Sequence, residues 1–107
     1  QLITFMTERS RDVALIVAGD FNLRSAQEPA KSQLARLLRS TGLRDSCAEL
    51  ACPSPGNIDK VLYRSSAQRQ LAAEAWRRDT ETFVTVDGEP LSDHVPVEVR
   101  FAWRAGM

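Results

Sequence analysis

The chain has 107 residues, which fits one domain or part of one. Its hydrophobic content of 43% and charged content of 26% are ordinary for a globular protein, and no apolar run approaches the roughly 20 residues of a membrane helix. Cationic and acidic residues number 14 each, so the formal net charge is zero and no basic excess points to a nucleic-acid partner.

The first residues are expected to lie in a helix, because Leu2, Phe5 and Met6 follow helical spacing. Residues 1–10 lack the basic start and apolar core of a signal peptide. We therefore expect the chain to be a fragment whose upstream half, with any targeting signal, is missing.

The segment 13–18 is a short apolar run rich in β-branched side chains, which predicts a strand buried on both faces. Residues 29–40 are predicted to form a helix, since Pro29 suits a first turn and Gly42 a C-terminal stop. Its apolar stripe consists of Leu34, Leu37 and Leu38.

The second half of the chain predicts mainly strands. Residues 58–63 and 82–86 have strand composition, and residues 95–103 place apolar side chains on one face at period two. Residues 69–77 are ambiguous, because their helix propensity conflicts with their strand-rich surroundings. Residues 53–56 predict a turn. This order of elements predicts an α+β or layered α/β fold.

Cys47 and Cys52 stand close together in the sequence. A disulfide between them and a pair of free thiols are equally compatible with this spacing. A zinc site is disfavoured, because the chain offers only one histidine, His94, as a further nitrogen ligand.

Three short segments carry polar groups suited to chemistry at strand ends. Asp20 and Asn22 follow the first strand and project to the same side of an extended backbone, where a carboxylate and an amide can hold a water and a phosphate oxygen. An Asx turn that ends the strand is the alternative interpretation. Asp59 shares a strand face with Val61 and Tyr63, so it needs a partner unless that face is exposed.

The third segment contains His94 beside Asp93 at the start of the last strand. An imidazole can act as a general base near neutral pH, and a carboxylate can bind Mg²⁺. A lone histidine is more often structural. However, Asp59 needs a donor and His94 an acceptor, so the two can form a carboxylate–imidazole pair that activates water.

Together, Gly19-Asp20-Phe21-Asn22, Ile58-Asp59 and Ser92-Asp93-His94 resemble the endonuclease/exonuclease/phosphatase superfamily, which includes deoxyribonuclease I. The resemblance implies half of a four-layer α/β sandwich, mainly antiparallel sheet with flanking helices. Residues 1–107 would form the C-terminal half of that domain.

The resemblance also implies roles for individual residues. His94 would deprotonate the attacking water, Asp59 would orient His94, and Asp20 would position or polarise the nucleophile. Asn22 would contact the scissile phosphate and Asp93 would help hold a divalent cation, Mg²⁺ or another such as Mn²⁺. Lys60 could also touch the phosphate.

The chain departs from the family pattern, because the metal-binding Glu, the early Asn and the second catalytic His of the family normally lie upstream. We therefore expect the fragment alone to be poorly active or inactive, to expose one inner sheet face, and to need the missing N-terminal half of the domain as its partner. A non-catalytic binding domain that retains the fold is the alternative.

The cysteine pair and the stretch from Ile58 to Arg64 look somewhat like secreted bacterial members, including sphingomyelinase-like phosphodiesterases. A nuclease is the close rival. The expected substrate is a phosphodiester, either nucleic acid or a phospholipid head group, and the neutral charge slightly favours the head group. A secreted protein is favoured over a cytoplasmic one.

Overall fold

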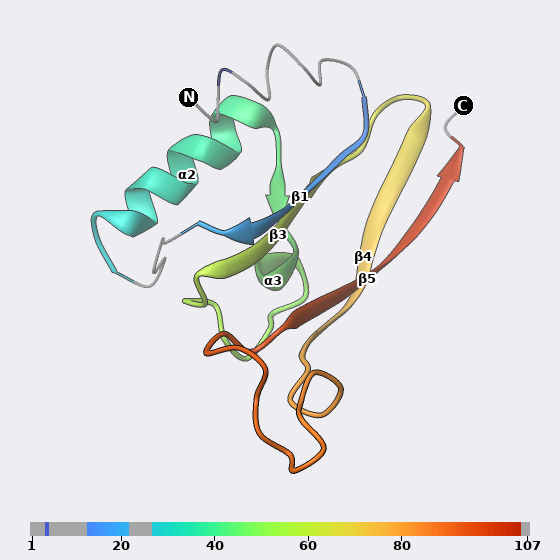
Figure 1. Ribbon diagram of the computed structural model, residues 1–107. Helices are drawn as coiled ribbons and strands as arrows, with labels where there is room; N and C mark the ends of the chain where they lie inside the picture. Colours follow the sequence, from blue (N-terminus) through green and yellow to red (C-terminus); the bar gives the residue numbers. More distant parts are fainter. Residues whose placement is uncertain (1–3, 5–12, 22–26, 106–107) are drawn as a thin grey trace.

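The computed structural model describes residue 4, residues 13–21 and residues 27–105. Its elements, in chain order, are β1 (Leu15–Asp20), α2 (Ala30–Thr41), β2 (Arg44–Asp45), α3 (Ser46–Glu49), β3 (Asp59–Arg64), β4 (Arg69–Arg78) and β5 (Val97–Ala105). They form a mixed α+β structure with antiparallel sheets and few helices (Figure 1). This agrees with the predicted class and is compatible with half of an α/β sandwich. The helix expected around residues 2–6 lies outside the described residues, apart from Thr4.

The first sheet has the order β1-β3-β2, with antiparallel pairing throughout. Leu15 and Val17 of β1 pack against the core on one face of this sheet. The expectation that β1 is buried on both faces is wrong, because Ile16 on the other face is 48% exposed. Helix α2 covers only the first of these faces, so the apolar run of β1 is half covered.

Helix α2 buries its predicted leucine stripe against this sheet. The helix follows Pro29 and ends before Gly42, whose left-handed φ of 73° lets its N–H donate to the Leu38 carbonyl. None of the described helices is long and apolar enough to cross a bilayer. The resulting core consists of Leu34, Leu37, Leu43 and Leu62.

The second sheet is the long antiparallel ribbon of β4 and β5. The ambiguous segment 69–77 is therefore a strand, because pairing with β5 outweighs its modest helix propensity. Strand β5 begins at Val97, just after Pro96, which has no N–H to donate to a ladder. The rings of Tyr63 and Phe101 meet edge to face at 5.1 Å and join the two sheets.

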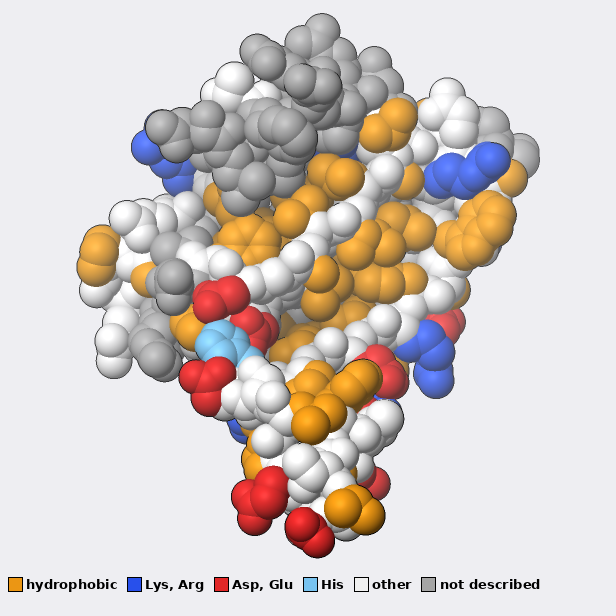
Figure 2. Space-filling model, in the orientation of Figure 1, with side chains coloured by type: hydrophobic (Ala, Val, Ile, Leu, Met, Phe, Trp, Pro, Cys, Tyr) orange, Lys and Arg blue, Asp and Glu red, His pale blue; other side chains and the backbone are white. Residues whose placement is uncertain are grey.

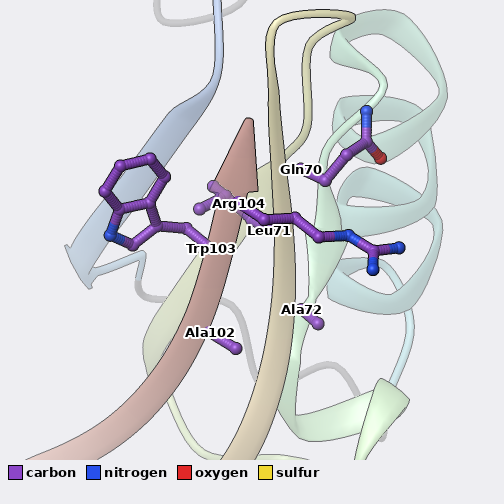
Figure 3. A pocket seen from close by; sticks show the side chains of 6 residues that line it. All are labelled: Gln70, Leu71, Ala72, Ala102, Trp103 and Arg104. Atoms are coloured by element: carbon purple, nitrogen blue, oxygen red, sulfur yellow. The ribbon is translucent and has the colours of Figure 1, made fainter. Parts of the chain in front are cut away.

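The open end of the ribbon presents apolar surface. Trp103 is 65% exposed, and the Arg69 guanidinium lies 5.5 Å from the centre of its ring. A hollow of about 300 Å³ lies beside it, shown in Figure 3. Its lining consists of Gln70, Leu71, Ala72, Ala102, Trp103 and Arg104.

The strand expected at residues 82–86 is wrong, since this part of the β4–β5 connection contains only one isolated bridge, between Val84 and Pro90. The turn predicted after it is present, with Gly88 at a φ of 84° and its N–H donating to the Thr85 carbonyl over 2.9 Å. In the described part of the chain no further strand lies beside this segment, so its strand-forming side chains have no ladder to join.

Candidate functional site

Two carboxylates meet at one end of the first sheet. The antiparallel register sets Asp20 of β1 directly opposite Asp59 of β3, so both side chains project from the same face. Like charges in directly opposed positions repel, and a cation or hydrogen-bond donor between them relieves the repulsion. Asp20 is 38% and Asp59 23% exposed, so both remain accessible to solvent.

The imidazole of His94 lies against these carboxylates. Its Nδ1 is 2.8 Å from Oδ2 of Asp59, and its Nε2 is 3.9 Å from Oδ2 of Asp20. Figure 2 shows the pale blue ring among acidic side chains. The predicted contact between Asp59 and His94, which lie 35 residues apart in sequence, is therefore present. The roles proposed for the two residues remain predictions.

The contact with Asp59 determines which nitrogen of the neutral imidazole carries the proton and also raises the pKa of His94. An ionised carboxylate only accepts hydrogen bonds, so in the neutral imidazole Nδ1 carries the proton and Nε2 keeps its lone pair. The hydrogen bond and the charge of Asp59 raise the pKa of His94, with smaller contributions from Asp93 and Asp20, while desolvation opposes them. The arrangement gives a basic nitrogen, Nε2, on a side chain that is 40% exposed.

Asp79 anchors the β4–β5 connection that carries His94. Its side chain is only 3% exposed, and its Oδ1 accepts from the amides of Glu81 at 3.0 Å and Thr82 at 2.9 Å. Its own N–H donates to the Pro96 carbonyl over 2.8 Å, which closes the connection two residues after His94. The sequence analysis did not select Asp79. The signal that could have found it is the preference of aspartate for turns, where its side chain accepts hydrogen bonds from backbone N–H groups two and three residues further along.

Acidification should remove the stabilisation that Asp79 provides. The hydrogen bonds from Thr82 and Glu81 lower the pKa of Asp79 from 3.8 to about 2. Because the pKa is lower in the folded state, the stabilisation is present above pH 3.8 and is lost as the pH falls through about 2. Urea unfolding measured between about pH 5 and about pH 2 gives the free energy of unfolding of wild type and of Asp79→Asn. The difference between these two free energies should shrink as the pH falls. A difference that stays constant would contradict the assignment.

The side chains of Asp20, Asp59 and His94 also form a candidate metal centre. One ligand atom from each of Asp20, Asp59 and His94 lies within 4.8 Å of the other two, so the group could hold a divalent cation. The carboxylates suit Mg²⁺, which prefers oxygen ligands, whereas an imidazole is better suited to transition metals. The predicted ligand Asp93 is exposed and next to His94 in the chain, but does not belong to this group.

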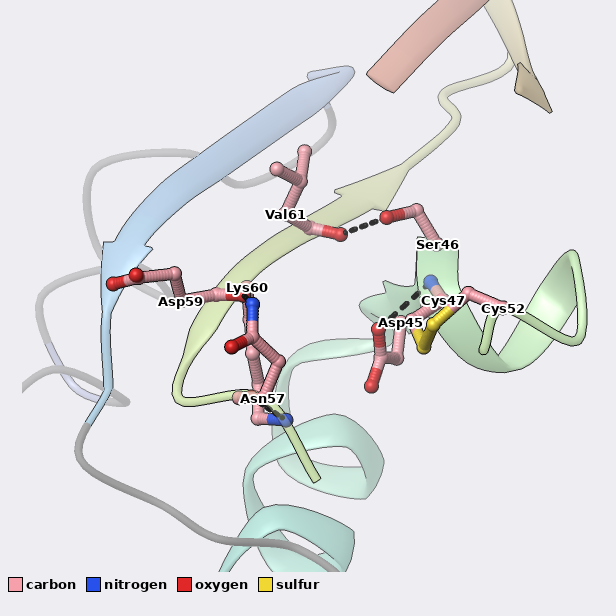
Figure 4. Close-up of a disulfide and its surroundings, with 8 residues drawn as sticks. All are labelled: Asp45, Ser46, Cys47, Cys52, Asn57, Asp59, Lys60 and Val61. Carbon is pink, nitrogen blue, oxygen red and sulfur yellow. Dashed lines mark hydrogen bonds between the residues drawn. A yellow bond between two sulfur atoms is a disulfide. The ribbon is translucent and has the colours of Figure 1, made fainter. Parts of the chain in front are cut away.

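The structure places Lys60 away from the position expected for a phosphate contact. Neighbouring residues of a strand face opposite sides, so Lys60 points to the side opposite Asp59. Its side chain is 4% exposed, and its Nζ donates to the Asn57 carbonyl over 2.8 Å. Burial lowers the pKa of Lys60, and the charge of Asp45 opposes that shift. Figure 4 shows Asp59 extending from β3 towards β1. Asn22, the other predicted phosphate contact, lies outside the described residues.

Cys47 and Cys52 form a disulfide, which decides between the two alternatives left open by the sequence. The bridge closes the short α3 segment beside β3 (Figure 4). Ser46, which is fully buried, donates from Oγ to the Val61 carbonyl over 2.7 Å. The N–H of Cys47 donates to Oδ1 of Asp45 over 3.0 Å. The disulfide therefore belongs to a segment that is hydrogen-bonded to β3, the strand that carries Asp59.

Two hollows adjoin His94. One, of about 330 Å³, lies between β1, β3 and the start of β5, and its lining includes Gly19, Asp59 and His94. The other, of about 390 Å³, lies in the β4–β5 connection and is lined mostly by apolar side chains, including Phe83 and Leu91. The space beside the Asp59–His94 pair is thus open enough to admit a small substrate group.

Comparison with known proteins finds sequence similarity over nearly the whole chain. No protein-family model and no solved structure match it. Proteins named sphingomyelinase from Mycobacterium tuberculosis (strain H37Rv) and Mycobacterium bovis are each 31% identical over 119 residues, covering 98% of this chain and 24% of theirs. The chain thus spans about a quarter of the length of these curated relatives.

Proposed function

We propose that the chain is part of a metal-dependent phosphodiesterase that cleaves a phospholipid diester with water activated by His94. The observation that carries this proposal is the 2.8 Å contact between Nδ1 of His94 and Oδ2 of Asp59. In the neutral ring this contact leaves the lone pair on Nε2, and His94 lines an open hollow. The mycobacterial relatives named sphingomyelinase support the same reaction class.

In the proposed reaction, Nε2 of His94 removes a proton from a water molecule as the water oxygen attacks phosphorus. The new phosphorus–oxygen bond forms as the bond to the leaving alkoxide breaks. Asp59 stabilises the imidazolium formed in this step and holds the ring in orientation. Turnover is complete when the imidazolium releases its proton and the alkoxide gains one.

Asp20 is suited to orient the water. Its Oδ2 lies 3.9 Å from Nε2 of His94, so a water between the two could donate to the carboxylate and the imidazole at once. Asn22, two residues further along the chain, is proposed to contact the scissile phosphate. Its amide would donate to a non-bridging phosphate oxygen.

We propose Mg²⁺, or another divalent cation such as Mn²⁺, as the cofactor. A bound cation would neutralise charge that develops on the phosphate. Carboxylate oxygens of Asp20 and Asp93 are the proposed ligands from this chain. His94 is better used as the base, because Mg²⁺ prefers oxygen ligands and coordination would occupy the Nε2 lone pair.

A phospholipid head group is favoured over nucleic acid for two reasons. Sphingomyelin, the substrate that the relatives' name indicates, is a phosphodiester lipid, and this chain has no net positive charge to attract a polyanion. The disulfide suits an oxidising compartment, which favours a secreted protein. We also propose that a further segment of the intact protein completes the domain over the exposed face of β1.

Removal of divalent metal should abolish activity of the intact protein. With sphingomyelin vesicles as substrate, release of the phosphorylated head group should fall to background in a chelator and return when Mg²⁺ is added in excess. Plasmid DNA incubated in parallel is the comparison substrate. Cleavage of DNA alone would identify a nuclease instead. Failure to hydrolyse either substrate or to bind Mg²⁺ would favour a non-catalytic binding domain.

A further inference from the structure

Two hydrogen bonds hold the turn that leads into β3, where Asp59 is the first residue of the strand. Nζ of Lys60 donates to the Asn57 carbonyl over 2.8 Å, and Nδ2 of Asn57 donates to the Asp59 carbonyl over 3.1 Å. Together they fix the backbone at the residue where the strand begins. The Asp59 carboxylate can contact His94 only if this backbone holds its position.

A buried carboxylate, that of Asp45, also affects Lys60 electrostatically. The carboxylate of Asp45 acts electrostatically on the Lys60 ammonium and accepts from the N–H of Cys47 over 3.0 Å. Asp45 is itself only 7% exposed, and the Cys47–Cys52 disulfide closes the same segment (Figure 4). The charge of Asp45 therefore relates the segment closed by the disulfide to Lys60.

The ammonium of Lys60 is not needed to fill space. Lys60 lies on the same side of β3 as the core residue Leu62, where an apolar side chain would avoid the cost of burying a charge. What a hydrocarbon cannot provide is the directed hydrogen bond to the Asn57 carbonyl. We therefore expect Lys60 to contribute mainly by fixing the local backbone geometry through its hydrogen bond, and less by adding to the stability of the fold.

We propose that Lys60 is a positioning residue: its hydrogen bond to Asn57 holds the Asn57–Lys60 turn so that the Asp59 carboxylate meets Nδ1 of His94. The inference rests on the proposed function for its kinetic consequence only. A displacement of about 1 Å is enough to reduce turnover by on the order of a hundredfold in a pre-organised site. Lys60 thereby acts on the reaction through Asp59, without touching the substrate.

The test compares Lys60→Met with Lys31→Met in the intact protein. Methionine keeps the length of the side chain and removes its donors, and Lys31 is an exposed lysine of α2 that serves as the matched control. Lys60→Met should lower kcat for sphingomyelin by on the order of tenfold to a hundredfold with KM unchanged. The deshielded Nδ1 proton of His94 should also weaken or vanish in its NMR spectrum, after assignment by its loss in His94→Ala. Lys31→Met should alter neither readout.

An unchanged kcat together with an unchanged Nδ1 proton in Lys60→Met would overturn the proposal. A raised KM with normal kcat and an intact proton signal would show a substrate contact instead, and would equally overturn it. If Lys60→Met does not fold, Asn57→Ala decides: loss of the proton signal in a folded variant supports the proposal, and an intact signal refutes it. If wild type hydrolyses no phosphodiester, the proposed function fails while the NMR comparison still tests the positioning.

Discussion

Replacing His94 with alanine should reduce turnover of the intact protein at least about a hundredfold, the usual scale for loss of a general base. The side chain that would take the proton from water is removed, and alanine offers no group that could accept a proton in its place. The effect should fall on kcat, because the imidazole is not expected to contribute to substrate binding. Steady-state hydrolysis of sphingomyelin vesicles measures it.

Glu89→Ala is a suitable control for His94→Ala, since it changes an exposed side chain in the same β4–β5 connection. Its turnover should stay near that of wild type. Near-normal turnover of His94→Ala would contradict the role of His94 as the base. Equal losses in both variants would indicate damage to the connection itself.

Replacing Asp59 with asparagine should lower kcat by about a hundredfold to ten-thousandfold, as expected when the residue that orients a catalytic imidazole is neutralised. An amide can donate to Nδ1, which would move the imidazole proton to Nε2 and block the base. Asparagine also removes the charge and the hydrogen bond that raise the pKa of His94. The two effects are separable, because one changes the maximal rate and the other changes its dependence on pH.

The pH profile gives the sign of the second effect. The base must be neutral, so activity of wild type should rise with pH through a pKa above the ordinary 6.5 of histidine. In Asp59→Asn this acid limb should move to lower pH. Asp87→Asn, at an exposed acid in the β4–β5 connection, should leave the limb in place. An unshifted limb in Asp59→Asn would show that the pair does not control the titration.

The elements that could be predicted from sequence are those with strong local signals. The leucine spacing and Gly42 define α2, and the strand composition of residues 58–63 indicates β3. Residues 69–77 and 82–86 show the limit of this reasoning. The first has helix propensity and forms a strand because β5 lies beside it, whereas the second has strand propensity and no described strand beside it. In both segments, the presence or absence of a pairing strand from a distant part of the described chain determined the secondary structure.

The candidate site divides in the same way. Residue types and their places at strand ends made Asp20, Asp59 and His94 candidates, and a carboxylate on an apolar strand face, as at Asp59, needs a partner. Only the tertiary structure decided that the β1–β3 register sets the two acids opposite each other and that Asp79 holds the connection carrying His94. It also turned Lys60 away from them, because side chains alternate along a strand and the far side of β3 belongs to the core.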